Sequence, residues 1–278
     1  MPAASVSELL GLQPCPPSAK CIYVTAGAAA GPAQLAETAR LIADDAMALR
    51  MGLSPVLSWW RLVRDGAPSP QPAKHRAAVE AFVQDTFGLP GDPGDFGLLQ
   101  GFVAELLWHR LVRERTAPGG GRALVHVEDL SWSAYQQGGD GLAVYEVADG
   151  TLVFRLWEIK KHDSTAHISA TVNRAAKQLD RNALKYLAQY TGYGSKRGGR
   201  LGALYADLVP LWLNDDPRSG VGVSIATSTA MAPKRVALGG VATIFPDFAR
   251  DQREGVIVAL QDFPDFAQDV RDAVWKGL

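Results

Sequence analysis

A β-hairpin signal between residues 141 and 159 restricts the fold of this 278-residue chain more than any other segment. Two runs of mostly apolar residues, Leu142–Val147 and Leu152–Ile159, flank the turn sequence Asp149-Gly150. Such a sequence suits a tight turn, because glycine adopts positive backbone φ angles without a steric cost. The segment therefore predicts two antiparallel strands that pair with each other.

The loop length sets which residues of the hairpin face each other. With the three-residue loop 148–150, Val147 faces Thr151, and counting back along both strands places Asp140 opposite Glu158. Side chains that face each other in this way have Cβ atoms about 4.5–5.5 Å apart. Two carboxylates at this distance repel each other unless a proton or a cation lies between them.

The second strand has two faces, because side chains alternate along a strand. One face carries Phe154 and Leu156 and continues into Glu158 and Lys160; the other carries Val153, Arg155, Trp157 and Ile159. An acid and an amine that continue an apolar row are expected to be partly buried. Burial of such groups is costly unless they are paired with each other or with a metal.

Other segments predict the surrounding elements. Helices are expected from Pro32 to Gly52, from Ser54 through Leu62, and over 75–87, 97–115, 168–190 and 265–276. Strands are expected at 21–24, 124–127, 208–213, 222–226 and 256–260, and a loop rich in Gly, Lys and Arg over 192–200. Segment 88–96 is dense in Gly and Pro and marks the best domain boundary.

This order of elements predicts an α/β, or layered α+β, fold with a central mixed sheet flanked by helices. We expect a mainly helical N-terminal region over residues 1–94 and a second domain over 95–278. No apolar run reaches the roughly 18 residues that a membrane helix needs, so no membrane association is expected. The two cysteines exclude a disulfide framework, and the cytoplasm is the expected location.

Charge is distributed unevenly along the chain. The whole chain has a net charge of −1, which excludes a strongly basic protein that binds any nucleic acid. Residues 174–200 contain seven basic residues and one acid, a net +6, so the remainder of the chain carries −7. The basic residues are Arg174, Lys177, Arg181, Lys185, Lys196, Arg197 and Arg200. On a helical wheel the first four share one face, which is either a solvated surface or a surface that neutralises backbone phosphates.

The acids and the lysine of the hairpin suit metal-assisted hydrolysis of phosphodiester bonds. Carboxylate oxygens are preferred ligands of Mg²⁺, which keeps positions for water and for a phosphate oxygen. The cation makes water more acidic and neutralises charge on the phosphate, and a nearby lysine stabilises developing negative charge. We therefore expect Asp140 and Glu158 to bind Mg²⁺, with Mn²⁺ as a substitute, and Lys160 to assist the reaction.

The ordered set Asp140…Glu158-Ile159-Lys160 resembles the motif of the PD-(D/E)XK nuclease superfamily, which has the restriction-endonuclease-like fold. That family usually places a helix with an acidic residue before the hairpin and another helix after the lysine strand, and the sequence predicts both. The resemblance covers roughly residues 97–190, a third of the chain. The proline of the family motif is absent, because Gly139 precedes Asp140.

The resemblance also implies roles for two residues on the flanking helices. Glu105 lies about 20° from Leu98 on a helical wheel, at the edge of the apolar sector, from which it can reach inward. The resemblance implies that Glu105 is an additional metal ligand, directly or through water. It also implies that Gln178 assists near the metal site, although the Gln-x-x-x-Tyr spacing of the family is not met, since Tyr186 lies eight residues on.

Within the superfamily, the Gly-Gly-Asp-Gly turn and the strand end Trp-Glu-Ile-Lys-Lys-His-Asp-Ser are similar to the nuclease component of the Hachiman antiphage system and its relatives. This similarity implies DNA as the target, bacterial defence as the role and a separately encoded helicase or ATPase as a partner. Three alternatives stay open: a surface hairpin with a cross-strand ion pair, a docking module without catalysis and an RNA nuclease. His162 and His167 are expected in an exposed loop and at a helix start, because no further ligand completes a zinc site.

Overall fold

The computed structural model describes residues 5–114, 121–131, 140–233 and 237–278. The first part of the chain contains α1 (Val6–Leu10), β1 (Gln13–Pro14), β2 (Ile22–Ala26), α2 (Pro32–Met51), α3 (Pro55–Arg64), α4 (Pro72–Phe87) and α5 (Phe96–Glu114). The second part contains β3 (Ala123–Val127), β4 (Gly141–Glu146), β5 (Leu152–His162), α6 (Ile168–Gly194), α7 (Gly199–Leu213), β6 (Val221–Ser228), η1 (Thr229–Met231), α8 (Gly239–Ile244), η2 (Arg250–Gln252), β7 (Arg253–Leu260) and α9 (Phe263–Trp275).

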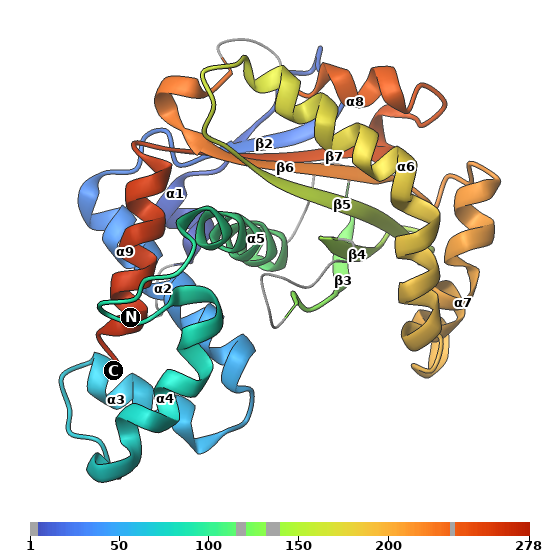
Figure 1. The fold of residues 1–278 in the computed structure, drawn as a ribbon. Coiled ribbons are helices and arrows are strands. Elements are labelled where there is room, and N and C mark those ends of the chain that lie inside the picture. Colours follow the sequence, from blue (N-terminus) through green and yellow to red (C-terminus); the bar gives the residue numbers. More distant parts are fainter. Residues whose placement is uncertain (1–4, 115–120, 132–139, 234–236) are drawn as a thin grey trace.

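A mixed sheet of the described strands, in the order β1-β2-β7-β6-β5-β4-β3, forms the centre of the fold (Figure 1). Strands β2, β7, β6 and β5 run parallel to one another, whereas β4 pairs antiparallel with both β3 and β5. Helices lie on both faces of this sheet (Figure 1). The fold is therefore of the expected α/β class, with a mixed sheet between layers of helices.

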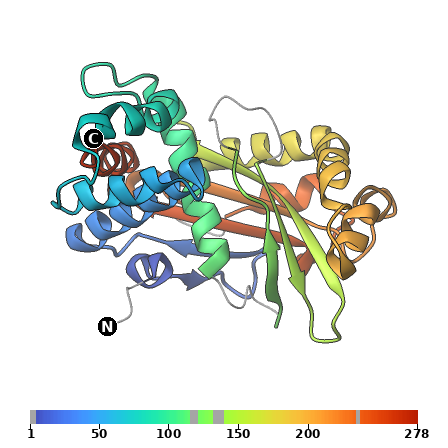
Figure 2. The ribbon, with the colours of Figure 1, turned by 90° about the horizontal axis from the view of Figure 1, so that it is seen from below.

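The two faces of the sheet are buried against different helices. Helix α5 crosses one face, where α2 and α9 also pack, and α6 lies on the opposite face with α8 (Figures 1 and 2). Along β5, Trp157 and Ile159 belong to the core on the α5 side, whereas Phe154 and Leu156 belong to the core on the α6 side. The expected alternation of the strand is therefore confirmed.

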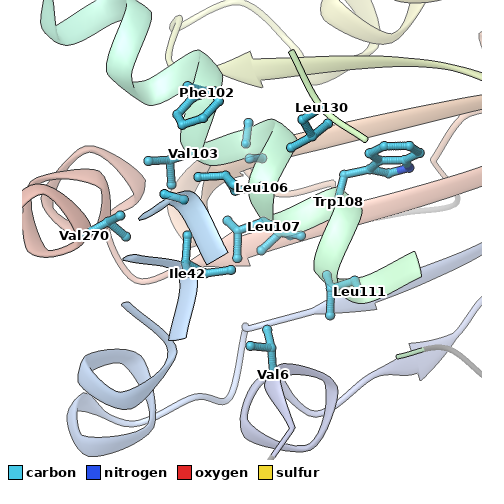
Figure 3. Close-up of a cluster of buried hydrophobic side chains, with 14 of the residues drawn as sticks. Val6, Ile42, Phe102, Val103, Leu106, Leu107, Trp108, Leu111, Leu130 and Val270 are labelled. Atoms are coloured by element: carbon cyan, nitrogen blue, oxygen red, sulfur yellow. The ribbon is translucent and has the colours of Figure 1, made fainter. Parts of the chain in front are cut away.

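The core on the α5 side is assembled around α5. Its residues Val103, Leu107 and Trp108 are fully buried, and they lie among Ile42 of α2 and Val270 of α9 (Figure 3). Complete burial of one such apolar side chain contributes roughly 1.5–3 kcal/mol. This packing fixes α5 on the sheet and so determines where the polar residues on the edge of this helix can reach.

The hairpin register agrees with the prediction. The Cα partners run from Gly141 opposite Trp157 to Glu146 opposite Leu152, and the Val147 amide donates to the Thr151 carbonyl at 3.0 Å. The same register, extended by one pair beyond β4, sets Asp140 opposite Glu158.

One predicted strand is wrong. Residues 208–213 belong to helix α7, which begins at Gly199 and contains Pro210 in its last turn. The buried residues Leu204, Leu208 and Leu211 recur at helical spacing and pack into the core on the α6 side. A short apolar run is compatible with either a strand or a buried helix, and here the preceding residues extend the helical pattern.

The expected boundary at 88–96 falls in the loop between α4 and α5. Strand β2, which precedes this loop, pairs in parallel with β7 near the end of the chain. One core cluster also contains residues from both sides, such as Ile42 and Val103. The first 94 residues therefore contribute two strands to the central sheet as well as helices α1–α4. None of the helices in the described ranges has the length and apolar character needed to span a membrane.

Candidate active site

The open end of the β4–β5 hairpin brings together Asp140, Glu158 and Lys160. The Lys160 ammonium contacts Oε1 of Glu158 and lies 3.4 Å from Oδ2 of Asp140. The same Asp140 oxygen accepts a hydrogen bond from the Ile159 amide at 2.7 Å. The three residues that the sequence singled out on the hairpin therefore form one charged cluster, with the ammonium beside both carboxylates.

Glu158 is the most deeply placed member of this cluster. It is fully buried, and in the described part of the chain its Oε2 atom has no hydrogen-bond donor. Burial, and then the charge of Asp140, raises the pKa of the Glu158 carboxyl well above its usual range. Burial opposes the charge of Lys160, but the two carboxylates outweigh burial and raise the pKa of its ammonium. Both groups therefore hold their protons more tightly than they would in water.

Glu105 reaches the same cluster from α5. Its side chain is half-buried and lies near enough for the charges of Asp140, Lys160 and Glu158 to act on it. Burial first, and Asp140 second, raise the pKa of Glu105 to about 8. Glu105 therefore lies on α5 within electrostatic range of the hairpin cluster.

Two contacts that the sequence analysis missed hold α5 against this end of the hairpin. Trp108, one turn after Glu105, covers Gly141: a Cβ atom on this glycine would lie 2.1 Å from the indole ring. Nearer the start of α5, Lys161 donates to the Gln100 side chain at 2.8 Å and binds Asp163 at 2.7 Å. The glycine next to Asp140 was the available signal for the first contact, since a glycine within a strand often marks close approach of a neighbour.

The donor atoms of this cluster determine whether it suits a metal ion. In the described residues, no group of three or more His, Cys, Asp or Glu side chains is arranged to hold a metal ion. Asp140 and Glu158 both lie beside the Lys160 ammonium. The buried, donorless Oε2 atom of Glu158 is a suitable ligand atom for a hard cation.

Gln178, His162 and His167 lie in three different surroundings. Gln178 is half-buried on α6, and among the described residues it forms no hydrogen bond to the hairpin cluster. His167 is the N-cap of α6, at the helix start as expected. His162 was expected in an exposed loop, and this is wrong: it ends β5, is buried, and its Nδ1 lies 2.9 Å from the Thr171 hydroxyl. Strand β5 extends three residues further than the apolar run suggested.

The basic residues of α6 form the expected exposed face. Arg174, Lys177, Arg181 and Lys185 are exposed on the side opposite the buried row that includes Leu179. Within the described ranges, none of these four forms an ion pair. We call them the α6 basic stripe.

The basic residues that follow α6 divide into two kinds. Lys196 is exposed. Arg197 instead donates to both oxygens of the buried Glu128 at 3.1 Å and to His126 at 2.9 Å. Arg200 pairs with Glu146 at 3.3 Å and also donates to the carbonyl of Gly150. Arg197 and Arg200 therefore hold the loop after α6 against the hairpin sheet, a role that the sequence did not predict.

Comparisons with known proteins add no relative to this description: no family model, no curated protein and no solved structure matches the chain.

Proposed function

We propose that this protein is a metal-dependent nuclease that hydrolyses phosphodiester bonds of DNA at the open end of the β4–β5 hairpin. The observation that carries this proposal is the contact of the Lys160 ammonium with Glu158 and Asp140, with the half-buried Glu105 close by. Helix α5 before the hairpin and helix α6 after the lysine strand support the resemblance to PD-(D/E)XK nucleases and to their restriction-endonuclease-like fold.

Each residue of the cluster has a separate role in this proposal. Asp140 and Glu158 would hold Mg²⁺, or Mn²⁺, and Glu105 would be a further ligand directly or through water. The cation, when bound, supplies charge neutralisation at the phosphate and acidifies water. Lys160 orients the attacking water and stabilises the negative charge that develops on the phosphate. The cation would displace the proton that burial favours on Glu158 and would bind its Oε2 atom, which has no hydrogen-bond donor among the described residues.

The α6 basic stripe supports a polyanionic substrate. Its four exposed cations have no internal partner among the described residues, so they are available to phosphates. Lysine and arginine contacts to the backbone provide affinity without sequence preference. This agrees with a site whose chemistry acts on the phosphodiester and not on the base.

Cleavage of a supercoiled plasmid tests the proposal. Wild-type protein is incubated with Mg²⁺, Mn²⁺ or EDTA, and nicked and linear products are separated on a gel. We expect nicking or linearisation with either metal and none with EDTA. The double variant Glu158→Ala/Lys160→Ala should bind DNA but not cleave it. The matched control, Glu80→Ala/Lys276→Ala, makes the same chemical changes away from the hairpin and should cleave normally.

A second candidate function is a docking module that binds nucleic acid without cleavage. The contact between Lys160 and the carboxylates favours it, because this ion cluster is partly neutralised without a metal. Absence of cleavage with both metals, together with DNA binding that survives Lys160→Ala, would support the module. An RNA substrate added in parallel distinguishes a ribonuclease. The proposed role in antiphage defence, with a helicase or ATPase partner, is supported only by the sequence resemblance.

A further inference from the structure

A small pocket on the α6 side of the molecule has an unusual combination of aromatic walls and acidic rim. We call it the Trp212 pocket; it has a volume of about 160 Å³. Its aromatic walls are Trp212, Phe245 and Phe248, and its acids are Asp180, Asp215 and Asp247. These residues come from α6, from the end of α7 and from the segment that follows α8. The pocket is separate from the hairpin cluster.

The aromatic walls form a corner. Phe245 and Phe248 are stacked at an interplanar angle of 11°, and Trp212 stands at 80° and 90° to them. Both phenylalanines are buried, whereas Trp212 is half-exposed at the end of α7. The electron-rich face of an indole is the best aromatic surface for a cation. The half-exposed Trp212 ring is therefore the part of this corner that a ligand can reach.

The carboxylates at the rim of the pocket lack ion-pair partners in the described part of the protein. Asp180, Asp215 and Asp247 are exposed, and none of them forms an ion pair with another described residue. Of the nearby cations, Arg218 pairs with Asp216 at 3.0 Å and Arg253 donates to the carbonyls of Ala242 and Phe245. Asp180 shares α6 with the stripe residues Lys177 and Arg181. Asp215 and Asp247 therefore supply the negative charge beside the aromatic surface that no neighbouring cation pairs with in the described residues.

The volume and the negative charge of the Trp212 pocket restrict which chemical group can bind in it. Pockets for drug-sized molecules or cofactors have volumes of about 300–1,000 Å³, so this pocket accommodates only a side-chain end. Three carboxylates repel phosphates, which excludes the nucleic acid backbone. A planar guanidinium both stacks on an indole face and donates hydrogen bonds to carboxylates, whereas a compact ammonium does not stack in this way.

We propose that the Trp212 pocket is a docking site for an arginine side chain of a partner protein. The guanidinium stacks on Trp212 and donates hydrogen bonds to the carboxylates of the rim. Exposed Leu213, beside Trp212, and Leu184, one turn after Asp180, supply apolar surface for the neighbouring residues of the partner. This interaction does not depend on the proposed nuclease activity.

The test follows the indole N–H signal of Trp212 in two-dimensional NMR spectra of the full chain, assigned by its loss in Trp212→Phe. The probe is a capped Gly-Arg-Gly tripeptide, with ethylammonium, tetramethylammonium, free arginine and sodium chloride as comparisons. We expect a saturable shift with the tripeptide and a dissociation constant in roughly the millimolar range, as for a single small anchor. The double variant Asp215→Asn/Asp247→Asn should weaken this binding at least tenfold.

The control variant Asp207→Asn removes an exposed acid of α7 outside the pocket and should leave tripeptide binding unchanged. Several results would overturn the proposal. These are a shift no larger than that with sodium chloride, equal binding of either ammonium ion, tighter binding of free arginine than of the capped peptide, and unchanged binding in the double aspartate variant. Because both substituted aspartates are exposed, the double variant is expected to fold, and its spectrum verifies this directly.

Discussion

The carboxylate of Asp140 is held by the backbone of the facing strand: its Oδ2 atom accepts a hydrogen bond from the Ile159 amide at 2.7 Å. Strand β4 begins at Gly141, so Asp140 lies one residue before the paired strand. Its side chain, and not its backbone, forms the hydrogen bond to β5 at this position. The hydrogen bond sets Asp140 opposite Glu158 and within 3.4 Å of the Lys160 ammonium. The position of the site therefore depends on the pairing of the hairpin and not on a flexible loop.

The stability of the protein should fall as the pH rises from about 6.5 to about 8, a window above the range in which the lowered pKa values of His109 and His162 act in the opposite direction. The pKa of Glu105 is raised to about 8 in the folded protein, and that of Glu158 is also raised, so each binds its proton more tightly than in the unfolded chain. In this window the unfolded chain has already lost these protons, and the free energy of unfolding decreases with pH. Thermal unfolding in EDTA across this range measures the effect.

The variant Glu105→Gln should flatten this dependence, since an amide does not titrate. Glu80→Gln, on α4, is the matched control and should keep the wild-type slope. A wild-type melting temperature that rises over the same range would contradict the assigned pKa shift.

Substitution of Gly141 should disturb the site through packing. A Cβ atom at this position would overlap the ring of Trp108, so Gly141→Ala must displace α5 or the start of β4. Such overpacking typically costs about 1–3 kcal/mol in the free energy of unfolding. Chemical denaturation measures the loss. The control is Gly101→Ala, also a glycine beside the site but open to space, which should be neutral or stabilising because alanine favours a helix.

Local patterns predicted much of the site. The Asp149-Gly150 turn and the alternation along 152–160 were sufficient to set the hairpin register and the face that carries Glu158 and Lys160. The helical wheel placed Glu105 at the edge of its apolar sector, and its pKa is raised first by burial and then by the charge of Asp140 in the hairpin cluster. Such patterns succeed because register and face follow from short-range geometry.

Long-range packing decided the features that the sequence did not predict. Residues 208–213 are helical because Leu204, Leu208 and Leu211 pack together into the core on the α6 side. Elements distant in the sequence form the rest of that core. The partner of Arg197 is Glu128, which lies 69 residues earlier in the sequence, before the hairpin. Neither result follows from local propensity, because each depends on a contact formed only after folding.

Arg197 should matter for stability more than for substrate binding. Replacement by alanine removes the guanidinium nitrogen that donates to both oxygens of the buried Glu128 carboxylate. Loss of a buried charged partner costs roughly 1–3 kcal/mol. Lys196→Ala, at the exposed neighbouring position, should change the free energy of unfolding by less than about 0.5 kcal/mol. Equal unfolding midpoints for the two variants in urea would show that the Arg197 contacts are not structural.

Binding of DNA should depend on the α6 basic stripe and on salt. Each phosphate contact contributes a slope of about −0.9 to log K against log salt for duplex DNA. Neutralisation of Arg174, Lys177, Arg181 and Lys185 to glutamine should reduce the slope by up to about 3.6. Fluorescence anisotropy with a labelled duplex in EDTA measures the slope. A wild-type slope in the quadruple variant would show that the α6 basic stripe does not contact DNA.

The central claim is tested most directly by the single-turnover cleavage rate of a labelled DNA duplex at saturating Mg²⁺, compared between wild type and Lys160→Met. The variant keeps most of the side-chain volume and removes the charge. The account predicts that the rate falls by at least about 100-fold while the dissociation constant for DNA stays within a few-fold of wild type. Equal cleavage rates for the two proteins, or no cleavage by wild type with either Mg²⁺ or Mn²⁺, would contradict a catalytic role for this lysine at the hairpin.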